Sequence, residues 1–548
     1  MNTNYKHDSI ENGAYRENAV KKALGAVLFL ISFGMIVYSA FLCKSNDIWY
    51  DELFSMEFAG RPISEIIKLT AADVHPPLYY IILHKPIKVL TMLGFSPVMV
   101  AKTISVVPFA LLWLYAAIAL RNRYGLFLSG LFSVAVIGMP NMSEYTVEIR
   151  MYSLVIFFIT AMCIHARPFI EKDPEKQIKG LKWNMAFPLF AYGLLACYTQ
   201  YYAAVAVAAI YLFLVIWSIR KNIWQLGILL ISGNLTLVCF FPWIGKVISQ
   251  ASTVASNYWI QDLTWRSLGG VVKYLVLPAF SSNAINVTAA VILAVLMFVV
   301  VIRNIRNEYM WLCFSPIIGI VVFGFAVSFI MRPIFVYRYM LPGMGAFWLG
   351  ITLAAGKAIN GDDTKQDEAD NRGVRAISRY LAAALVAVMV VVGIRDYWAF
   401  RGNELYRKVN MTKTQELFRT LHLRDDLVII CNFDHVEGLT AYYMNDFKGY
   451  TAIDFLGKEI NLFGVPVKLY GSEPEPLIKE MVEGTGSIED GAAIKKYLEN
   501  GETVLFFGSF NSREDLVKEW LDTYGIKNEN KGSYLLERYW FDVYELHL

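Results

Sequence analysis

The segment ALGAVLFLISFGMIVYSAFL at positions 23–42, followed at positions 48–55 by IWYDELFS, decides the fold of this chain. The first part is an apolar run of about 20 residues, the length that an α-helix needs to cross the hydrocarbon core of a bilayer. The second part places an aromatic pair and two adjacent acids, Asp51 and Glu52, directly after that run. Aromatic residues of this kind mark the point where a span leaves the membrane. The first run is too long for a cleavable signal peptide and no small-residue cleavage site follows it, so we expect a retained anchor.

Similar apolar runs recur through most of the chain. Of its 548 residues, 56% are hydrophobic and only 18% are charged, which is unlike the composition of a soluble globular protein. We therefore expect a polytopic α-helical membrane protein with about eleven spans. These spans are predicted near residues 23–42, 99–120, 124–140, 150–166, 185–199, 202–218, 224–245, 285–302, 310–330, 337–356 and 378–394.

Lysine and arginine residues gather in alternate loops, which predicts the orientation of the spans. Short loops rich in these residues stay in the cytoplasm. If residues 1–22 are cytoplasmic and eleven spans follow, all six basic clusters fall on one side of the membrane. The prediction places the membrane domain at 23–394, its first external loop at 43–75 and the remaining residues 395–548 outside.

The segment PPLYYIILHKPIKVLTMLG, residues 76–94, is apolar but interrupted by His84, Lys85, Pro86 and Lys88. If it crossed the membrane, the basic loop that follows the next span would lie outside. We therefore expect a helix in the outer interface, with its aromatic and basic groups at the level of the lipid headgroups. A full crossing is the alternative.

The chain after the last predicted span has a different character. From Arg395 onward it holds 18 Lys and Arg against 26 Asp and Glu. The short apolar runs at 425–433 and 502–510 are suited to buried strands, and helix-like stretches lie between and after them. We expect a soluble α/β domain that has a structural role or covers the substrate.

Ionisable residues collect in the predicted external loops. An acid held at a membrane surface, such as Asp51 or Glu52, can act as a general base or as a metal ligand, although acids beside aromatic interface residues can also merely solvate a loop. His75 follows Asp73 by two residues and precedes two prolines, which restrict the backbone. We therefore expect His75 to be held at the membrane surface and to be functional.

Two later external loops add further ionisable residues. Glu148 follows Glu144 by four residues and, with Arg150, enters the next span, where ionisable groups are costly and often functional. An ion pair that only anchors the helix end is the alternative. Arg332 and Arg338 lie among tyrosines in another loop, and a guanidinium group binds phosphate in bidentate fashion. Snorkelling toward ordinary lipid headgroups readily explains one such arginine.

At these residues the chain resembles the GT-C glycosyltransferases, in particular the bacterial enzymes related to protein O-mannosyltransferases and to the aminoarabinose transferase of lipid A. The family pattern is an acidic pair in the first external loop, an (H/K)PPLYY stretch, and an acid in the second external loop. The resemblance covers about residues 20–400 and implies a GT-C fold, interfacial helices and a bacterial plasma membrane. The matching stretches are Asp51-Glu52, His75-Pro-Pro-Leu-Tyr-Tyr80 and Glu148-x-Arg150-Met-Tyr152.

The resemblance also implies an activity, which is transfer of a sugar from a polyprenyl-phosphate donor on the outer face of the membrane, with inversion. Asp51 is then the base that deprotonates the acceptor hydroxyl, Glu52 supports it or contacts the sugar, and Glu148 is the second acidic position. Arg338 is the candidate for holding the leaving phosphate. The other candidate substrate-binding residues are His75, Tyr79, Tyr80, Lys85, Arg150, Tyr152, Tyr201 and Arg332.

The expected partners are the bilayer, the polyprenyl-linked sugar and a lipid, glycan or protein acceptor, and no nucleic acid. A divalent cation, Mg²⁺ or Mn²⁺, bridging Asp51 and Glu148 is compatible with this scheme but is not required by the sequence. A flippase or transporter for polyprenyl-linked glycans is the main alternative, although it would place ionisable residues near the middle of the bilayer and show internal repeats. A polysaccharide polymerase or ligase would use the same kind of donor. A catalytically inactive sensor is the third alternative.

Overall fold

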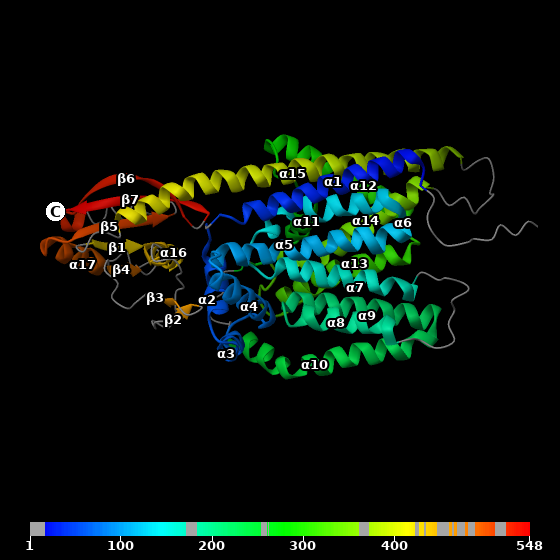
Figure 1. Ribbon diagram of the computed structural model, residues 1–548, viewed down its shortest axis with the longest axis horizontal. Helices are drawn as coiled ribbons and strands as arrows, with labels where there is room; N and C mark the ends of the chain where they lie inside the picture. The colour runs from blue at the N-terminus through cyan, green and yellow to red at the C-terminus, as the bar shows by residue number, and fades with distance from the viewer. Residues whose placement is uncertain are drawn as a thin grey trace, which may run out of the picture.

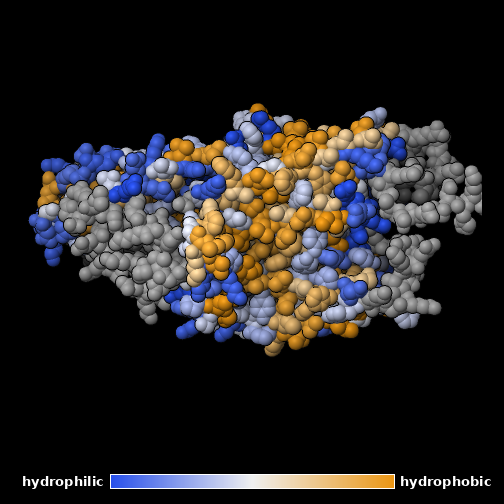
Figure 2. All heavy atoms as spheres, viewed as in Figure 1, coloured by the Kyte–Doolittle hydropathy of each residue, from blue (hydrophilic) through white to orange (hydrophobic). Residues whose placement is uncertain are grey.

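The computed structural model shows a long helical bundle with a small α/β domain at one end (Figure 1). We call the end of the bundle that carries this domain the domain-side end. Hydrophobic side chains form a broad band across the bundle, with hydrophilic residues on either side of it (Figure 2). The band corresponds to the part of the protein that spans the membrane. The structure describes residues 17–45, 47–170, 183–253, 260, 262–360, 372–421, 427–431, 434–445, 460–462, 465–467, 477–480, 488–509, 522–536 and 538–548.

Eleven helices of the described residues form the bundle, in agreement with the predicted spans. Nine stretches are long and apolar enough to cross a membrane. One of them, Pro97–Gly138, contains two helices, and Trp183–Cys197 is a shorter apolar helix. The eleven are α1 (Ala19–Leu42), α5 (Pro97–Tyr115), α6 (Arg121–Gly138), α7 (Tyr152–Ile170), α8 (Trp183–Cys197), α9 (Tyr201–Lys221), α10 (Leu226–Thr253), α12 (Asn283–Arg303), α13 (Glu308–Ile330), α14 (Leu341–Asn360) and α15 (Arg372–Leu421).

The chain turns back between α5 and the main part of α6, at Gly125. This residue has a φ of 85°, a conformation that glycine adopts without steric cost. The Glu17 carboxylate accepts hydrogen bonds from the backbone N–H groups of the two residues after Gly125, at 2.7 and 2.8 Å. Farther from Gly125, in the middle of α5, Ser105 Oγ donates to the carbonyl of Glu148 at 2.5 Å. The middle of α5 therefore lies against the loop that follows α6, and residues 97–138 make two crossings.

Three short helices pack on one another at the domain-side end: α2 (Tyr50–Gly60), α3 (Ile63–Ala72) and α4 (Leu78–Met92) (Figure 1). Helix α4 covers most of the interrupted segment and is not among the described helices that could span a membrane. His84 Nδ1 lies 2.8 Å from the carbonyl oxygen of Ala59 and holds α4 against the end of α2. This arrangement agrees with the prediction of a helix that does not cross. A fourth short helix, α11 (Arg266–Val276), packs against α12.

Helix α15 differs from the prediction because it continues beyond residue 394 to Leu421. Figure 1 shows it leaving the bundle and running along the domain. Its second half contains no proline and many residues that favour helix, so nothing ends the helix at the membrane surface. Thr414 Oγ1 donates to the carbonyl of Leu535 in the domain at 2.8 Å, and the Phe418 ring packs on Phe507. The helix thus joins the bundle firmly to the domain.

The described part of the domain is α/β, as predicted. Its five-stranded sheet has the order β4-β1-β5-β7-β6, in which β1 is parallel to β4 and β5, whereas β7 is antiparallel to β5 and β6. The predicted strands correspond to β1 and β5, and both are buried. The strands are β1 (Leu427–Cys431), β4 (Leu477–Glu480), β5 (Thr503–Ser509), β6 (Lys527–Leu536) and β7 (Tyr539–His547), with a separate pair β2 (Ile460–Leu462) and β3 (Val465–Val467) and the helices α16 (Asp434–Asn445) and α17 (Ile488–Glu499).

Candidate active site

The start of α2 is tied to the loop between α6 and α7 by Glu52. One carboxylate oxygen of Glu52 accepts the backbone N–H of Trp49 at 3.2 Å, in the manner of a capping residue. The other accepts the backbone N–H of Ile149 at 2.8 Å. The Glu52 side chain is buried, and each of its carboxylate oxygens accepts a hydrogen bond from a backbone N–H group. This geometry favours the supporting role for Glu52 over contact with a substrate.

Asp51, the neighbouring residue, lies between two arginines. Its Oδ2 atom is 3.3 Å from Nη1 of Arg338 and 3.7 Å from Nη2 of Arg150. Arg150 also donates to the Asp51 carbonyl at 3.1 Å. Burial by itself would raise the pKa of Asp51, but the two guanidinium groups outweigh it and hold the pKa below its usual range. Asp51 is therefore ionised at neutral pH, and its side chain remains 23% exposed.

His75 lies beside the same group of charges. Its Nδ1 atom is 2.9 Å from Oδ2 of Asp73. Burial would raise the pKa of Asp73, but the hydrogen bond and charge of His75 lower it below its usual range. The two following prolines lead into α4, where the N–H of Leu78 donates to the carbonyl of Tyr198 at 3.1 Å. His75 is thus held at the domain-side end, as the sequence predicted.

The predicted tyrosines are placed differently from one another. Tyr79 and Tyr80 are each only 1% exposed, and Tyr80 packs on Phe58 with the ring centroids 5.1 Å apart. Tyr152 is also buried, at the start of α7. Tyr201 joins α9 to α10, because its hydroxyl donates to Oε1 of Gln250 at 2.5 Å. Tyr79, Tyr80 and Tyr152 are thus packed inside the protein, whereas Tyr201 ties two helices together.

The remaining two predicted cations lie outside the ion pairs around Asp51. Lys85 is exposed on α4, and within the described residues it makes no ion pair with Asp51 or Glu148. Arg332 is half-buried in the loop between α13 and the 3₁₀ helix η5 (Tyr337–Met340), which carries Arg338. Of the predicted cations, Arg150 and Arg338 are therefore the two that the fold brings to Asp51.

Glu148 meets an arginine that the sequence reasoning missed. Arg538, in the turn between β6 and β7, places Nη2 3.4 Å from Oε1 of Glu148 and its guanidinium 4.3 Å from the ring centroid of Trp49. Burial raises the pKa of Glu148 to about 8, helped by the nearby acids Glu144 and Glu52 and opposed by Arg538. No local pattern around Arg538 indicates this contact, since it depends on how the domain docks.

The raised pKa of Glu148 predicts a pH dependence of stability. The folded protein keeps this proton up to about pH 8, whereas the unfolded chain loses it near the ordinary carboxyl pKa of 4.5. Between these values the unfolded state binds fewer protons, so the contribution of Glu148 makes the free energy of unfolding fall as the pH rises. Glu148→Gln is expected to flatten this fall, measured as the melting temperature in detergent from pH 5 to pH 8. Glu499→Gln, on the exposed face of α17, is the control, and equal slopes for all three proteins would contradict the assignment.

A second buried charge cluster lies next to the site and was also missed. Asp47 and Lys102 are almost completely buried, with Lys102 Nζ 3.1 Å from Oδ1 of Asp47. Arg407 of α15 lies 3.5 Å from the other Asp47 oxygen and pairs with Glu404 at 2.5 Å. Burial would raise the pKa of Asp47, but Lys102 and Arg407 lower it below its usual range. The cluster joins the first loop, α5 and α15.

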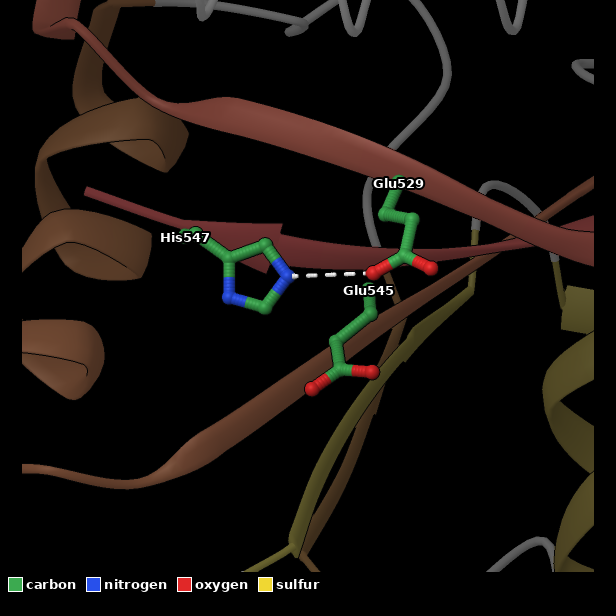
Figure 3. A group of neighbouring side chains, drawn as sticks. All are labelled: Glu529, Glu545 and His547. Atoms are coloured by element: carbon green, nitrogen blue, oxygen red, sulfur yellow. Dashed lines mark ion pairs between the residues drawn. The ribbon is translucent and has the colours of Figure 1, made fainter.

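Among the described residues, one group of three or more acids, histidines or cysteines has its ligand atoms close enough to hold a metal ion. It consists of Glu529, Glu545 and His547 on β6 and β7 (Figure 3). Lys531 Nζ lies 2.8 Å from Glu529 and 2.9 Å from Glu545, so an ammonium group already balances these acids. The group is an exposed ion-pair cluster on the surface of the domain.

These observations define the class of protein. It is a multi-pass helical membrane protein with a GT-C-type fold, in which charged side chains from several loops meet at one membrane surface beside a C-terminal α/β domain.

The solved structures that resemble this chain include that of ArnT from Cupriavidus metallidurans in the apo state. The match covers 95% of this chain and 98% of ArnT, with a TM-score of 0.51 and 12% identity. ArnT bound to undecaprenyl phosphate matches with 96% and 97% coverage, a TM-score of 0.49 and 12% identity. An Archaeoglobus fulgidus oligosaccharyltransferase in complex with Zn and sulfate matches with 88% and 67% coverage, a TM-score of 0.39 and 9% identity. No protein-family model and no curated protein matches the sequence. At these identities the likeness establishes the fold.

Proposed function

We propose that this protein is a membrane glycosyltransferase that moves a sugar from a polyprenyl-phosphate donor to an acceptor hydroxyl. The observation that carries the proposal is the ionised Asp51 carboxylate beside Arg338 and Arg150, at 3.3 and 3.7 Å. Displacing a phosphate from an anomeric carbon needs a base for the acceptor and positive charge for the leaving group. These three side chains supply both. The GT-C-type fold and the sequence resemblance support the same reaction class.

An apolar cavity supports a polyprenyl chain as part of the donor. It has a volume of about 550 Å³ and lies between α8, α9, α10 and α13 within the membrane part. Phe323 lines the cavity and packs on Tyr202, which in turn stacks on Tyr339 with the ring centroids 4.7 Å apart. Tyr339 follows Arg338 in the chain. A polyprenyl tail in the cavity would therefore bring its phosphate toward Arg338, and ArnT binds a lipid of this kind.

The proposed step is a single displacement. Asp51 removes the proton from the acceptor hydroxyl, and the acceptor oxygen attacks the anomeric carbon of the sugar. The bond from that carbon to the phosphate oxygen breaks, and its electron pair leaves with the polyprenyl phosphate. Arg338 and Arg150 balance the charge that grows on the phosphate. One displacement of this kind inverts the anomeric centre and needs one carboxylate base.

The donor set around the site does not fit a divalent cation. Asp51 faces Arg150 and Arg338, and Glu148 faces Arg538, so a cation bridging the two acids would meet positive charge on both sides. Glu52 uses both carboxylate oxygens for backbone N–H groups. We therefore assign the neutralisation of the phosphate to the arginines.

The distribution of basic residues supports an outward-facing active site. Arg123, Arg167, Arg220 and Arg303 lie in the loops and helix ends opposite to the domain, on the side that the positive-inside rule assigns to the cytoplasm. We propose that the domain-side end faces the outside of a bacterial plasma membrane. The acceptor would then be a lipid, a glycan or a protein of the cell envelope.

Arg338→Ala tests this function. Full-length protein in lipid nanodiscs is incubated with a set of radiolabelled polyprenyl-phosphate sugars, mannosyl and aminoarabinosyl donors included, and with membrane extract as the source of acceptor. The wild type is expected to transfer or release label, and Arg338→Ala to lower this rate about 10²–10³-fold, the loss typical for removing one charge-stabilising donor. Arg338→Lys should recover part of the rate because it restores the charge.

The control is Arg303→Ala, an exposed arginine at the opposite end of the bundle, which should keep the wild-type rate. Equal rates for Arg338→Ala and the wild type would remove Arg338 from the mechanism. If the wild type binds the polyprenyl-phosphate sugars but turns over none of them, the glycosyltransferase is rejected in favour of a flippase.

A further inference from the structure

A second cavity lies where the domain meets the bundle. Its volume is about 410 Å³, within the range of roughly 300–1,000 Å³ that small-molecule sites occupy. Its walls come from four segments: the loop after α6, residues 277–279, the middle of α15, and the turn between β6 and β7. It shares no lining residue with the apolar cavity inside the membrane part. The two cavities are thus separate: the first is lined mainly by apolar side chains, and the second by aromatic, polar and charged side chains.

The second cavity combines aromatic rings with groups that give and take hydrogen bonds. Phe400 and Trp540 contribute rings, and Trp540 is 42% exposed. Asn403 can both donate and accept, whereas Glu144 and Asp396 accept when ionised. A sugar ring has apolar C–H faces that pack on aromatic rings, and a rim of hydroxyls that donate and accept. The rings of the wall therefore suit the C–H faces of a sugar, and its polar side chains suit the sugar hydroxyls.

The charges of the wall disfavour other ligand classes. Arg407 is paired with Glu404 at 2.5 Å, and Arg538 with Glu148 at 3.4 Å. Glu144 and Asp396 add two further carboxyl groups to the wall, so a phosphate group would lie beside acids there. A long acyl chain would bury these polar groups without hydrogen-bond partners, which is costly. A neutral, hydroxyl-rich group remains.

The cavity adjoins the reaction centre through Arg538. This residue lines the cavity, and its guanidinium also contacts Glu148 and covers the ring of Trp49. In the sequence, Trp49 lies two positions before Asp51, and Glu148 lies two positions before Arg150. Asp51 and Arg150 form an ion pair of the proposed active site. The membrane cavity is connected to the neighbour of Arg338 through the ring contacts of Phe323, Tyr202 and Tyr339. The second cavity is connected to Glu148 through Arg538. Donor and acceptor can therefore reach the ion pair from different directions.

We propose that this second cavity binds a sugar unit of the acceptor, so that the acceptor substrate is a glycan or glycolipid. The inference rests on the proposed function and deepens it. Trp540 and Arg538 both come from the C-terminal domain, so the domain completes the acceptor site and is not only a support for the bundle.

Binding can be measured separately from transfer. Saturation-transfer-difference NMR is recorded on full-length protein in nanodiscs with three probes of similar size: methyl glucoside, methyl galactoside and methyl mannoside. The same experiment is repeated with glucose 6-phosphate. At least one methyl glycoside is expected to receive magnetisation from the wild type, and the phosphate to receive less. Trp540→Ala and Asn403→Ala are each expected to weaken methyl glycoside binding about tenfold, which corresponds to 1.4 kcal/mol.

The matched control is Trp398→Ala, an exposed tryptophan of α15 that does not line the cavity, and it should bind the glycosides as the wild type does. The proposal is overturned if no methyl glycoside binds, if Trp540→Ala and Asn403→Ala both bind as the wild type does, or if glucose 6-phosphate binds more tightly. Asp51→Asn should stop transfer and leave glycoside binding intact. The protein could also bind a methyl glycoside through Trp540 and yet transfer sugar from none of the donors. In that case the cavity is a sugar-binding site, and the proposed glycosyltransferase activity is rejected.

Discussion

Asp51→Asn is expected to lower the rate of sugar transfer about 10²–10⁴-fold, the usual contribution of a positioned general base. Asparagine keeps the size of the side chain but cannot take the proton of the acceptor hydroxyl. Its uncharged amide also weakens the interaction with Arg338 and Arg150, which lie 3.3 and 3.7 Å from the carboxylate. The rate is measured with the same radiolabelled donors in nanodiscs. Donor binding should persist, because both arginines remain.

The matched control is Asp73→Asn, another acid of the first loop, whose carboxylate is paired with His75 at 2.9 Å. It should lose much less activity than Asp51→Asn, since Asp73 is not the proposed base. If Asp51→Asn transfers sugar at the wild-type rate, Asp51 is not the base. Glu148, which carries a pKa of about 8, would then become the candidate.

Lys102→Met is expected to cause the largest loss of stability, about 3–5 kcal/mol, the cost of removing one partner of a buried ion pair. The side chains of Lys102 and Asp47 are 3% and 4% exposed, and their charged atoms lie 3.1 Å apart. Without Lys102, the partners that remain for the Asp47 carboxylate among the described residues are Arg407, at 3.5 Å, and the hydroxyl of Ser45. Methionine fills most of the volume, so the loss reports the charge rather than a cavity. Thermal unfolding in detergent measures it.

A double-mutant cycle separates the ion pair from other effects. The combined variant Asp47→Asn, Lys102→Met should lose less free energy of unfolding than the sum of the losses in the two single variants. The reason is that removing both partners leaves neither of the two charges buried without the other. Lys68→Met, at an exposed position of α3, is the control for replacing a lysine and should change the melting temperature little. Additive losses in the cycle would show that Asp47 and Lys102 are not coupled.

Most of the membrane fold could be predicted because each span carries its own signal. Apolar runs of the required length stand out from their polar flanks, and the eleven predicted spans correspond to eleven helices of the described chain. The basic residues Arg121 and Arg123 predicted a break between the spans at 99–120 and 124–140, and the structure places the turn at Gly125, just inside the second predicted span. The continuation of α15 to Leu421 was missed, because the change from an apolar to a charged sequence marks the membrane surface but does not end a helix.

The candidate site could be predicted only in part. The sequence predicted Asp51, His75, Glu148 and Arg150 as candidates because each lies in an external loop beside a span, where ionisable residues are conspicuous. The pairing of Asp51 with Arg338 joins residues 287 positions apart, and nothing in either segment specifies it. The burial of Tyr79 and Tyr80 was equally hidden, since an aromatic residue near a membrane surface can face either water or the protein core.

The sequence by itself determined that the chain spans the membrane many times and that the acids and arginines of the candidate site belong to loops on the same side of the spans, because hydrophobic length and charge bias act locally along the chain. Only the tertiary structure decided which charges meet. Arg338 on η5 reaches Asp51 at the start of α2, and Arg538 reaches Glu148 because α15 holds the domain against the end of the bundle. Buried charges need partners at close range, and those partners come from segments that are distant in sequence, so their pairing depends on the packing of the whole bundle.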